Sequence, residues 1–150
     1  MINCKIANVK FRFSLVSNLM KNQLEKYVTN EQGEINISSE IVDKINVPQM
    51  EAKFHSKYYD VYQHNDDLIQ IQKNENNGYI GAVIYKENSA IILMENGDVG
   101  RKEYLLTEYA CLYFILKHEN AILIHSSSIQ YKDKGILFIA SSGVGKSTQA

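Results

Sequence analysis

The residues of this sequence whose types and spacing best suit chemistry lie at its C-terminal end, in the run Ala140-Ser-Ser-Gly-Val-Gly-Lys-Ser. Gly143 and Gly145 stand where a Cβ would obstruct backbone N–H groups that turn inward around phosphate oxygens. Lys146 and Ser147 follow directly, as a lysine and a hydroxyl do in phosphate-binding loops. With Ala140 in place of the usual first glycine, the run predicts a nucleotide site.

Each residue of this loop has an expected role. Lys146 should reach the β and γ phosphates of ATP and act in catalysis, the Ser147 hydroxyl should hold Mg²⁺, and Thr148 should face the α phosphate side. The helix that starts after the loop would add the positive end of its dipole. The expected cofactors are therefore ATP and Mg²⁺. The remaining expected nucleotide-binding residues are Ser142, Gly143, Val144 and Gly145.

The elements around the loop indicate how much of a nucleotide site the chain contains. Residues 136–139 are aliphatic or aromatic and supply the strand that must precede such a loop. The five residues 146–150 would form a helix of only about 7 Å, too short to be stable alone. An acidic residue on a later strand normally completes the Mg²⁺ site. We therefore expect the front part of a longer protein, cut off after the loop and inactive as this fragment.

Composition and charge exclude several classes of protein. The chain has 150 residues, of which 45% are hydrophobic and 22% charged, as in ordinary globular proteins. The formal net charge is −1. No group of Lys and Arg is large enough to follow a nucleic-acid backbone, so we expect no nucleic-acid partner. The sequence has neither a signal peptide nor an apolar run of membrane-spanning length, which predicts no export and no membrane insertion.

The two cysteines, Cys4 and Cys111, indicate a cellular compartment. They are far apart in sequence and lack metal-ligand spacing. Cys111 lies in an apolar helical pattern that would bury it as a small hydrophobic residue. Because free cysteines persist in reducing surroundings, we expect a cytoplasmic protein.

Residues 1–100 are predicted to form an N-terminal α+β region. Residues 4–13 alternate between apolar and polar side chains and predict one strand, with an irregularity near Ala7. Ser17 and Asn18 can cap a helix that runs to about residue 28. Ser38 or Ser39 is expected to cap a short helical piece before Pro48.

The second part of this region predicts strands. Residues 54–62 carry four aromatic side chains, and their pattern does not show which face of a sheet each occupies. Three further strands are expected at 68–72, 79–85 and 91–94, because Asn-Gly and similar turn residues separate them. Short turns of this kind predict an antiparallel meander.

Residues 101–150 are predicted to begin a nucleotide-binding core, without a firm boundary before them. Residues 103–117 have helical periodicity with a broad apolar face. A strand at 121–129, a turn containing Gly135 and a strand at 136–139 follow. The turn is short enough to make these two strands an antiparallel pair.

Two segments of the chain resemble the superfamily of HPr serine kinase and ATP-dependent phosphoenolpyruvate carboxykinase, and within it the HPr-kinase-like proteins. They are residues 122–129, Ile-Leu-Ile-His-Ser-Ser-Ser-Ile, and residues 138–150, Phe-Ile-Ala-Ser-Ser-Gly-Val-Gly-Lys-Ser-Thr-Gln-Ala, and the hairpin expected at 130–135 between them is part of the resemblance. Members typically read Leu-His-Ala-Ser-Ala-Val, a short turn around Gly, then Phe-x-Gly-x-Ser-Gly-x-Gly-Lys-Ser-Thr. Here Ala140 stands where the family usually has Gly, and Ser126 where Ala or Gly is common.

The resemblance implies a fold and an activity. The fold would be α+β, with an antiparallel or mixed sheet and flanking helices leading into a phosphate-loop core like that of phosphoenolpyruvate carboxykinase. The activity would be transfer of a phosphoryl group from ATP to the hydroxyl of a small protein, a peptide or serine. Lys146 and the Mg²⁺ held by Ser147 would stabilise the charge of the transferred group. The family's acidic catalytic residues would lie after residue 150.

Several alternatives remain open at this level. His125 is expected either close to the phosphates, as a catalytic group, or as a core histidine with one hydrogen bond. Residues 123–146 also resemble the opening of a transporter ATPase, in which a β-hairpin precedes the phosphate loop. A chain that binds without catalysing is a third alternative. An oligomer is compatible with the sequence.

Overall fold

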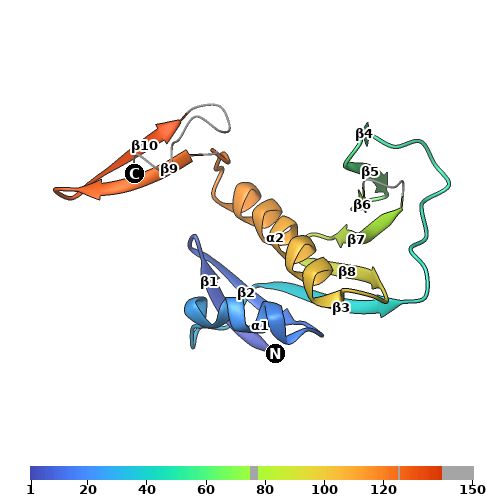
Figure 1. Cartoon of the computed structure of the whole chain (residues 1–150), viewed down its shortest axis with the longest axis horizontal. Coiled ribbons are helices and arrows are strands. Elements are labelled where there is room, and N and C mark those ends of the chain that lie inside the picture. The colour runs from blue at the N-terminus through green and yellow to red at the C-terminus, as the bar shows by residue number, and fades with distance from the viewer. Residues whose placement is uncertain (75–77, 125, 140–150) are drawn as a thin grey trace. The chain divides into compact units, whose positions relative to one another are not determined.

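The computed structural model of the chain describes residues 1–74, 78–124 and 126–139. The chain divides into two compact units, Met1–Glu119 and Asn120–Ala150. Figure 1 shows the elements of both units, which are described here one at a time.

The first unit is built on an eight-stranded mixed sheet with the strand order β1-β2-β3-β8-β7-β6-β5-β4. Strand β3 is parallel to both of its neighbours, β2 and β8, and every other pair in the sheet is antiparallel. The strands are β1 (Ile2–Ile6), β2 (Val9–Ser14), β3 (Ile35–Val42), β4 (Phe54–His55), β5 (Tyr59–His64), β6 (Asp67–Lys73), β7 (Tyr79–Tyr85) and β8 (Ser89–Glu95).

The first predicted strand is in fact a hairpin. Ala7 and Asn8 have φ angles of 48° and 69°, and Ile6 pairs with Val9 across the turn. Two consecutive residues with positive φ are typical of the tight turns whose twist matches that of antiparallel strands. The irregularity predicted near Ala7 is therefore a complete reversal of the chain.

The first helix begins as expected. Ser17 caps α1 (Asn18–Leu24), since its side chain accepts a hydrogen bond from the Met20 N–H. A 3₁₀ turn, η1 (Glu25–Tyr27), follows. The segment after it covers the outer edge of β1, where Thr29 N donates to Asn3 O at 3.0 Å. This contact protects an edge strand that would otherwise expose unpaired backbone groups.

The predicted helical piece at Ser38 or Ser39 is wrong, because both residues lie inside β3. Ile35, Ile37 and Ser39 alternate as buried residues along this strand. Sequence reasoning placed serines at a helix cap, where they are frequent. In the structure the neighbouring strands β2 and β8 pair with both edges of this segment, and this pairing decides its conformation.

The expected fold class is also wrong. We expected an α+β protein with a flanked sheet that leads into a phosphate-loop core. The described residues are mostly β, with two sheets and only α1, η1 and α2 (Val99–His118) as helices. One reason is that Ser38 and Ser39, predicted to begin a second helical piece, lie in the interior strand β3. Another is that β10, the strand before the loop, has only the antiparallel neighbour β9 among the described residues.

Helix α2 confirms the predicted helix at 103–117 and covers one face of the large sheet. Its buried residues recur three and four apart along one stripe: Glu103, Leu106, Thr107, Ala110, Cys111 and Phe114. They pack on aromatic and aliphatic side chains of the central strands, including Phe11, Phe13, Ile37, Val83 and Ile92. Gly81 of β7 permits this contact, because a Cβ there would lie 2.6 Å from Leu106 Cδ1.

A second, smaller core lies on the opposite face of the sheet. The segment between β3 and β4 crosses this face, and its Ile45 packs with Tyr62, Ile71 and Ala82. Glu95 holds the segment in place, since its Oε1 accepts a hydrogen bond from Ile45 N at 2.8 Å. The meander of β6, β7 and β8 supplies most of this face and confirms the three predicted strands.

The second unit contains a hairpin of β9 (Ser126–Tyr131) and β10 (Lys134–Ile139), and residues 121–124, which were predicted to begin the first of these strands, lie outside it. The antiparallel pairing of β9 and β10 confirms the hairpin predicted from the short turn. Lys132 and Asp133 form that turn with φ angles of 46° and 61°. Within the described residues, no helix is both long and apolar enough to cross a bilayer.

Candidate functional site

The β9–β10 hairpin is the described element that leads into the expected phosphate loop. Ile139, the last residue of β10, is followed directly by Ala140, where the loop motif starts. In the hairpin register Ile139 pairs with Ser126, and Ile136 pairs with Ile129. Strand β10 therefore ends where the motif begins, which is the order that a phosphate loop requires.

The predicted site residues themselves lie outside the described residues. His125 precedes Ser126, the partner of Ile139, so the sequence places it next to the open end of the hairpin. No contact of its side chain is described. The other predicted residues outside the described ranges are Ser142, Gly143, Val144, Gly145, Lys146, Ser147 and Thr148.

The apolar side chains of β10 are unusual for a two-stranded sheet. Leu137 and Ile139 are 54% and 64% exposed, and Ile136, on the other face, is also exposed. Strands that are apolar on both faces are typical of sheets covered on both sides. The composition of β10 thus suits a strand within a larger core, which is where phosphate loops are found.

A buried carboxylate, Glu103, is the most constrained acidic group of the first unit. Its exposed fraction is 0%. Its two oxygens accept hydrogen bonds from Val16 N at 2.8 Å and Ser17 N at 2.9 Å, and Ser39 Oγ also donates to it. Glu103 thereby joins α2, β3 and the start of α1. With no exposed atom it is a structural carboxylate and does not reach solvent or substrate.

Sequence reasoning missed Glu103 because glutamate is ordinarily a surface residue on a helix. A signal was nevertheless present. Glu103 and Thr107 share the stripe of Leu106, Ala110 and Phe114, which is otherwise apolar. A charged residue inside an apolar stripe must find hydrogen-bond donors when the stripe is buried.

A second ionic cluster lies on the far strands of the sheet, around Asp60. Lys73 Nζ and His55 Nδ1 are each 2.7 Å from Asp60 Oδ1. Lys73 also donates to the backbone oxygen of Ser56 at 3.0 Å. Burial alone would raise the pKa of Asp60, but the Lys73 ammonium and then His55 hold it below its ordinary value. Asp60 is therefore ionised and locks β4, β5 and β6 together.

Neither cluster forms a metal centre. Among residues 1–74, 78–124 and 126–139, no group of three or more His, Cys, Asp and Glu side chains is arranged to hold a metal ion. Ser147, the expected Mg²⁺ ligand, lies outside these ranges. Both cysteines are free and buried, and burial raises the pKa of Cys111 to about 12. Such thiols are poor nucleophiles and poor metal ligands.

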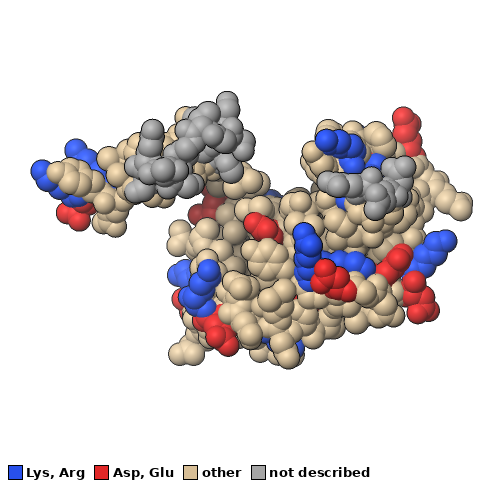
Figure 2. Space-filling model, in the orientation of Figure 1, with Lys and Arg blue, Asp and Glu red and all other residues tan. Residues whose placement is uncertain are grey.

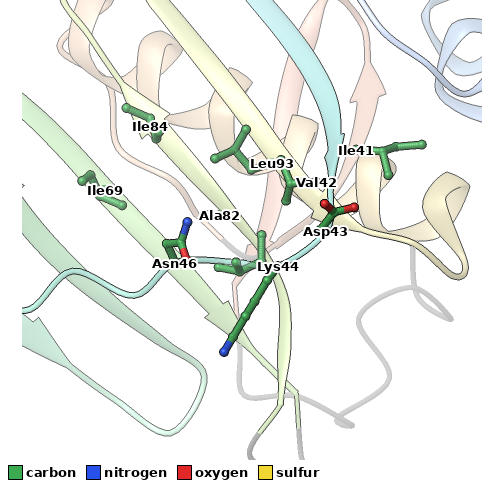
Figure 3. A pocket seen from close by; sticks show the side chains of 10 residues that line it. Ile41, Val42, Asp43, Lys44, Asn46, Ile69, Ala82, Ile84 and Leu93 are labelled. Carbon is green, nitrogen blue, oxygen red and sulfur yellow. The ribbon is translucent and has the colours of Figure 1, made fainter.

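A pocket of about 620 Å³ lies on the sheet face opposite α2, beside the segment that follows β3. Figure 3 shows its aliphatic floor, formed by Ile69, Ile84 and Leu93 from three neighbouring strands. Asp43, Lys44 and Asn46 contribute polar groups to its lining. The volume and aliphatic floor are those of small-ligand sites in general.

Comparisons of the chain with models of protein families, with curated proteins and with solved structures found no match.

Proposed function

We propose that this chain is the ATP-binding N-terminal part of an HPr-kinase-like phosphotransferase. One observation carries the proposal. An aliphatic strand that ends an antiparallel hairpin, β10, is followed at once by Gly143, Gly145, Lys146 and Ser147 in phosphate-loop spacing. This order of hairpin, strand and loop is the feature on which the resemblance to HPr-kinase-like proteins depends.

The proposed reaction transfers the γ-phosphoryl group of ATP to a hydroxyl, with a serine of a protein or peptide as the favoured acceptor. The acceptor oxygen forms a bond to phosphorus while the bond to the ADP oxygen breaks, and the hydroxyl proton leaves to a base. Lys146 would neutralise charge on the β and γ phosphates, and Ser147 would hold Mg²⁺, which would supply further neutralisation of phosphate charge. None of the acidic residues of this chain is assigned as the base.

His125 would support the same site from the neighbouring strand. The printed register ends with Ser126 opposite Ile139. Continuing that register by one residue would set His125 opposite the first residue of the loop motif. An imidazole close to bound phosphate would have its charged form stabilised. We therefore propose that His125 contacts the phosphates.

The proposed compartment is the cytoplasm. Cys4 and Cys111 are free and buried, with thiol pKa values that burial raises in both cases. Free thiols are typical of proteins in reducing surroundings.

The test uses the protein encoded by the whole reading frame that contains residues 1–150. Lys146→Ala should remove phosphoryl transfer and weaken ATP binding, because the compact ammonium between two phosphates is lost. Lys134→Ala, a lysine at the start of β10 and outside the motif, is the matched control. Binding is measured by calorimetric titration with Mg-ATP, and folding by circular dichroism. Equal ATP affinity in both variants would contradict the proposal.

A transporter-type or other phosphate-loop ATPase is the second candidate, because a hairpin precedes its loop as well. The reaction product distinguishes an ATPase from a kinase. An ATPase releases inorganic phosphate without labelling an acceptor, whereas a kinase transfers radiolabelled phosphate from ATP to a serine hydroxyl. Phosphate release with no phosphoserine on any added polypeptide or on free serine would favour the ATPase.

A further inference from the structure

The β4–β5 hairpin exposes aromatic and cationic side chains that the proposed nucleotide site does not use. Phe54 and Tyr58 are 50% and 57% exposed. Lys53, His55 and Lys57 are also exposed. We call these five exposed side chains the hairpin surface. Figure 2 shows Lys and Arg side chains over the part of the molecule where Figure 1 draws β4 and β5.

His55 of the hairpin surface already pairs with Asp60 at 2.7 Å, so the charge that an anionic partner can reach lies on Lys53 and Lys57. Asp60 is the nearest buried acid, and Lys73 already pairs with it at 2.7 Å. No carboxylate in the described ranges forms an ion pair with Lys53 or Lys57. Lys57 instead lies over the Tyr58 ring, 4.5 Å from its centroid. Both ammonium groups are therefore available to an anionic partner.

The backbone beneath this surface is held in one conformation. Ser56 Oγ accepts from Tyr58 N at 3.2 Å and Tyr59 N at 3.0 Å, and it donates to Tyr59 O at 2.9 Å. Lys73 donates to Ser56 O, and the rings of Phe54 and Tyr59 stack at 5.5 Å. A surface that is already ordered loses less entropy on binding.

From these observations we propose that the hairpin surface binds an acidic polypeptide segment with apolar residues between its carboxylates. Carboxylates of the segment would pair with Lys53 and Lys57, and its apolar side chains would cover Phe54 and Tyr58. Exposed aromatic residues are frequent anchors of protein interfaces, and the two lysines select for an acidic segment by charge. Nucleic acid is the less favoured partner, since its binders neutralise about six to ten phosphates and this surface offers two lysines.

Fluorescence anisotropy with a fluorescein-labelled peptide of repeated Glu-Glu-Leu tests the proposal on the chain 1–150. We expect binding at low ionic strength that weakens as salt is added. Changing Lys53→Glu and Lys57→Glu together should weaken binding about tenfold, since two attractions become repulsions. Glu51→Gln should strengthen binding, because Glu51 is the acidic residue closest in sequence to Lys53.

The matched control is Lys26→Glu with Lys44→Glu, which changes the net charge equally. Both are exposed lysines, and Lys26 lies over Tyr27 at 5.1 Å much as Lys57 lies over Tyr58. The control pair should leave peptide binding unchanged within about twofold. Equal losses in the two pairs, no binding at low salt, or tighter binding of a labelled oligothymidylate would each overturn the proposal. Circular dichroism verifies that all variants fold.

Discussion

Two buried acidic residues, Glu103 and Asp60, stabilise the first unit, and each has a different kind of partner. Glu103 is held by two backbone N–H groups and one hydroxyl. Asp60 is held by two cationic side chains. The first arrangement fixes where a helix begins, and the second ties the outer strands of the sheet together. Each can be tested by removing one charge.

Glu103→Gln should lower the free energy of unfolding by roughly 2 to 3 kcal/mol. Glutamine keeps the size of the side chain, but one of its ends is an N–H₂ donor. That donor would face the backbone N–H of Val16 or of Ser17, where an acceptor is required. Urea unfolding measures the change. Glu108→Gln, an exposed position on the same helix, is the control, and an equal effect there would show that Glu103 is not a structural anchor.

Asp60→Asn should destabilise the protein at neutral pH by on the order of 1 to 3 kcal/mol. The folded state holds the pKa of Asp60 below its ordinary value. The carboxylate therefore contributes stability above its unfolded pKa of about 3.9, and this contribution is lost as pH falls through the folded pKa. Wild type and variant should converge in urea midpoint as the pH falls below the folded pKa of Asp60. Asp66→Asn, at an exposed position, should show no such pH-dependent difference.

Secondary-structure elements pack closely where β7 contacts α2. A Cβ at Gly81 would lie 2.6 Å from both Leu106 Cδ1 and Leu93 O. Backbone atoms of β8 cannot move aside without disturbing the centre of the sheet. The close packing of α2 on β7 therefore depends on Gly81 having no side chain.

Gly81→Ala should destabilise the first unit by about 1 to 3 kcal/mol, the usual cost of overpacking. Gly135→Ala in β10 is the control, because nothing lies within 4 Å of a Cβ built there. Thermal unfolding followed by circular dichroism measures both variants. If Gly81→Ala matched wild type while Gly135→Ala did not, the packing of α2 on β7 would have to be looser than described.

At the scale of the whole molecule, the two compact units contain different structural features. Met1–Glu119 contains both hydrophobic cores, the pocket and the hairpin surface. Asn120–Ala150 contains the β9–β10 hairpin and the loop motif. Nucleotide binding belongs to the second unit in our proposal, and polypeptide binding belongs to the first.

The chain 1–150 by itself should show no measurable phosphoryl transfer and at best weak binding of Mg-ATP. No acidic residue among residues 1–150 is assigned to complete the Mg²⁺ site, so the phosphate charge would be only partly neutralised. Calorimetric titration with Mg-ATP measures the affinity. A dissociation constant in the micromolar range would contradict this prediction and would mean that residues 1–150 contain more of the site than we infer.

Short-range features of the sequence predicted several elements correctly. The period of apolar residues at 103–117 predicted α2, Ser17 predicted the start of α1, and turn residues predicted the meander and the β9–β10 hairpin. These features depend on residues three or four apart, or on a tight turn, so neighbouring residues carry the information. The loop motif at 140–147 is also a local pattern, but it lies outside the described residues and stays a prediction.

Only the tertiary structure decided the rest. Ser38 and Ser39 lie in the central strand because β2 and β8, distant in sequence, pair with both edges of β3. Glu103 is buried because residues 16, 17 and 39 supply its donors. The hairpin surface is exposed because β4 lies at the end of the sheet order. Each outcome depends on contacts between residues far apart in the chain, and no local sequence pattern specifies such contacts. The mostly β architecture follows from these long-range strand pairings.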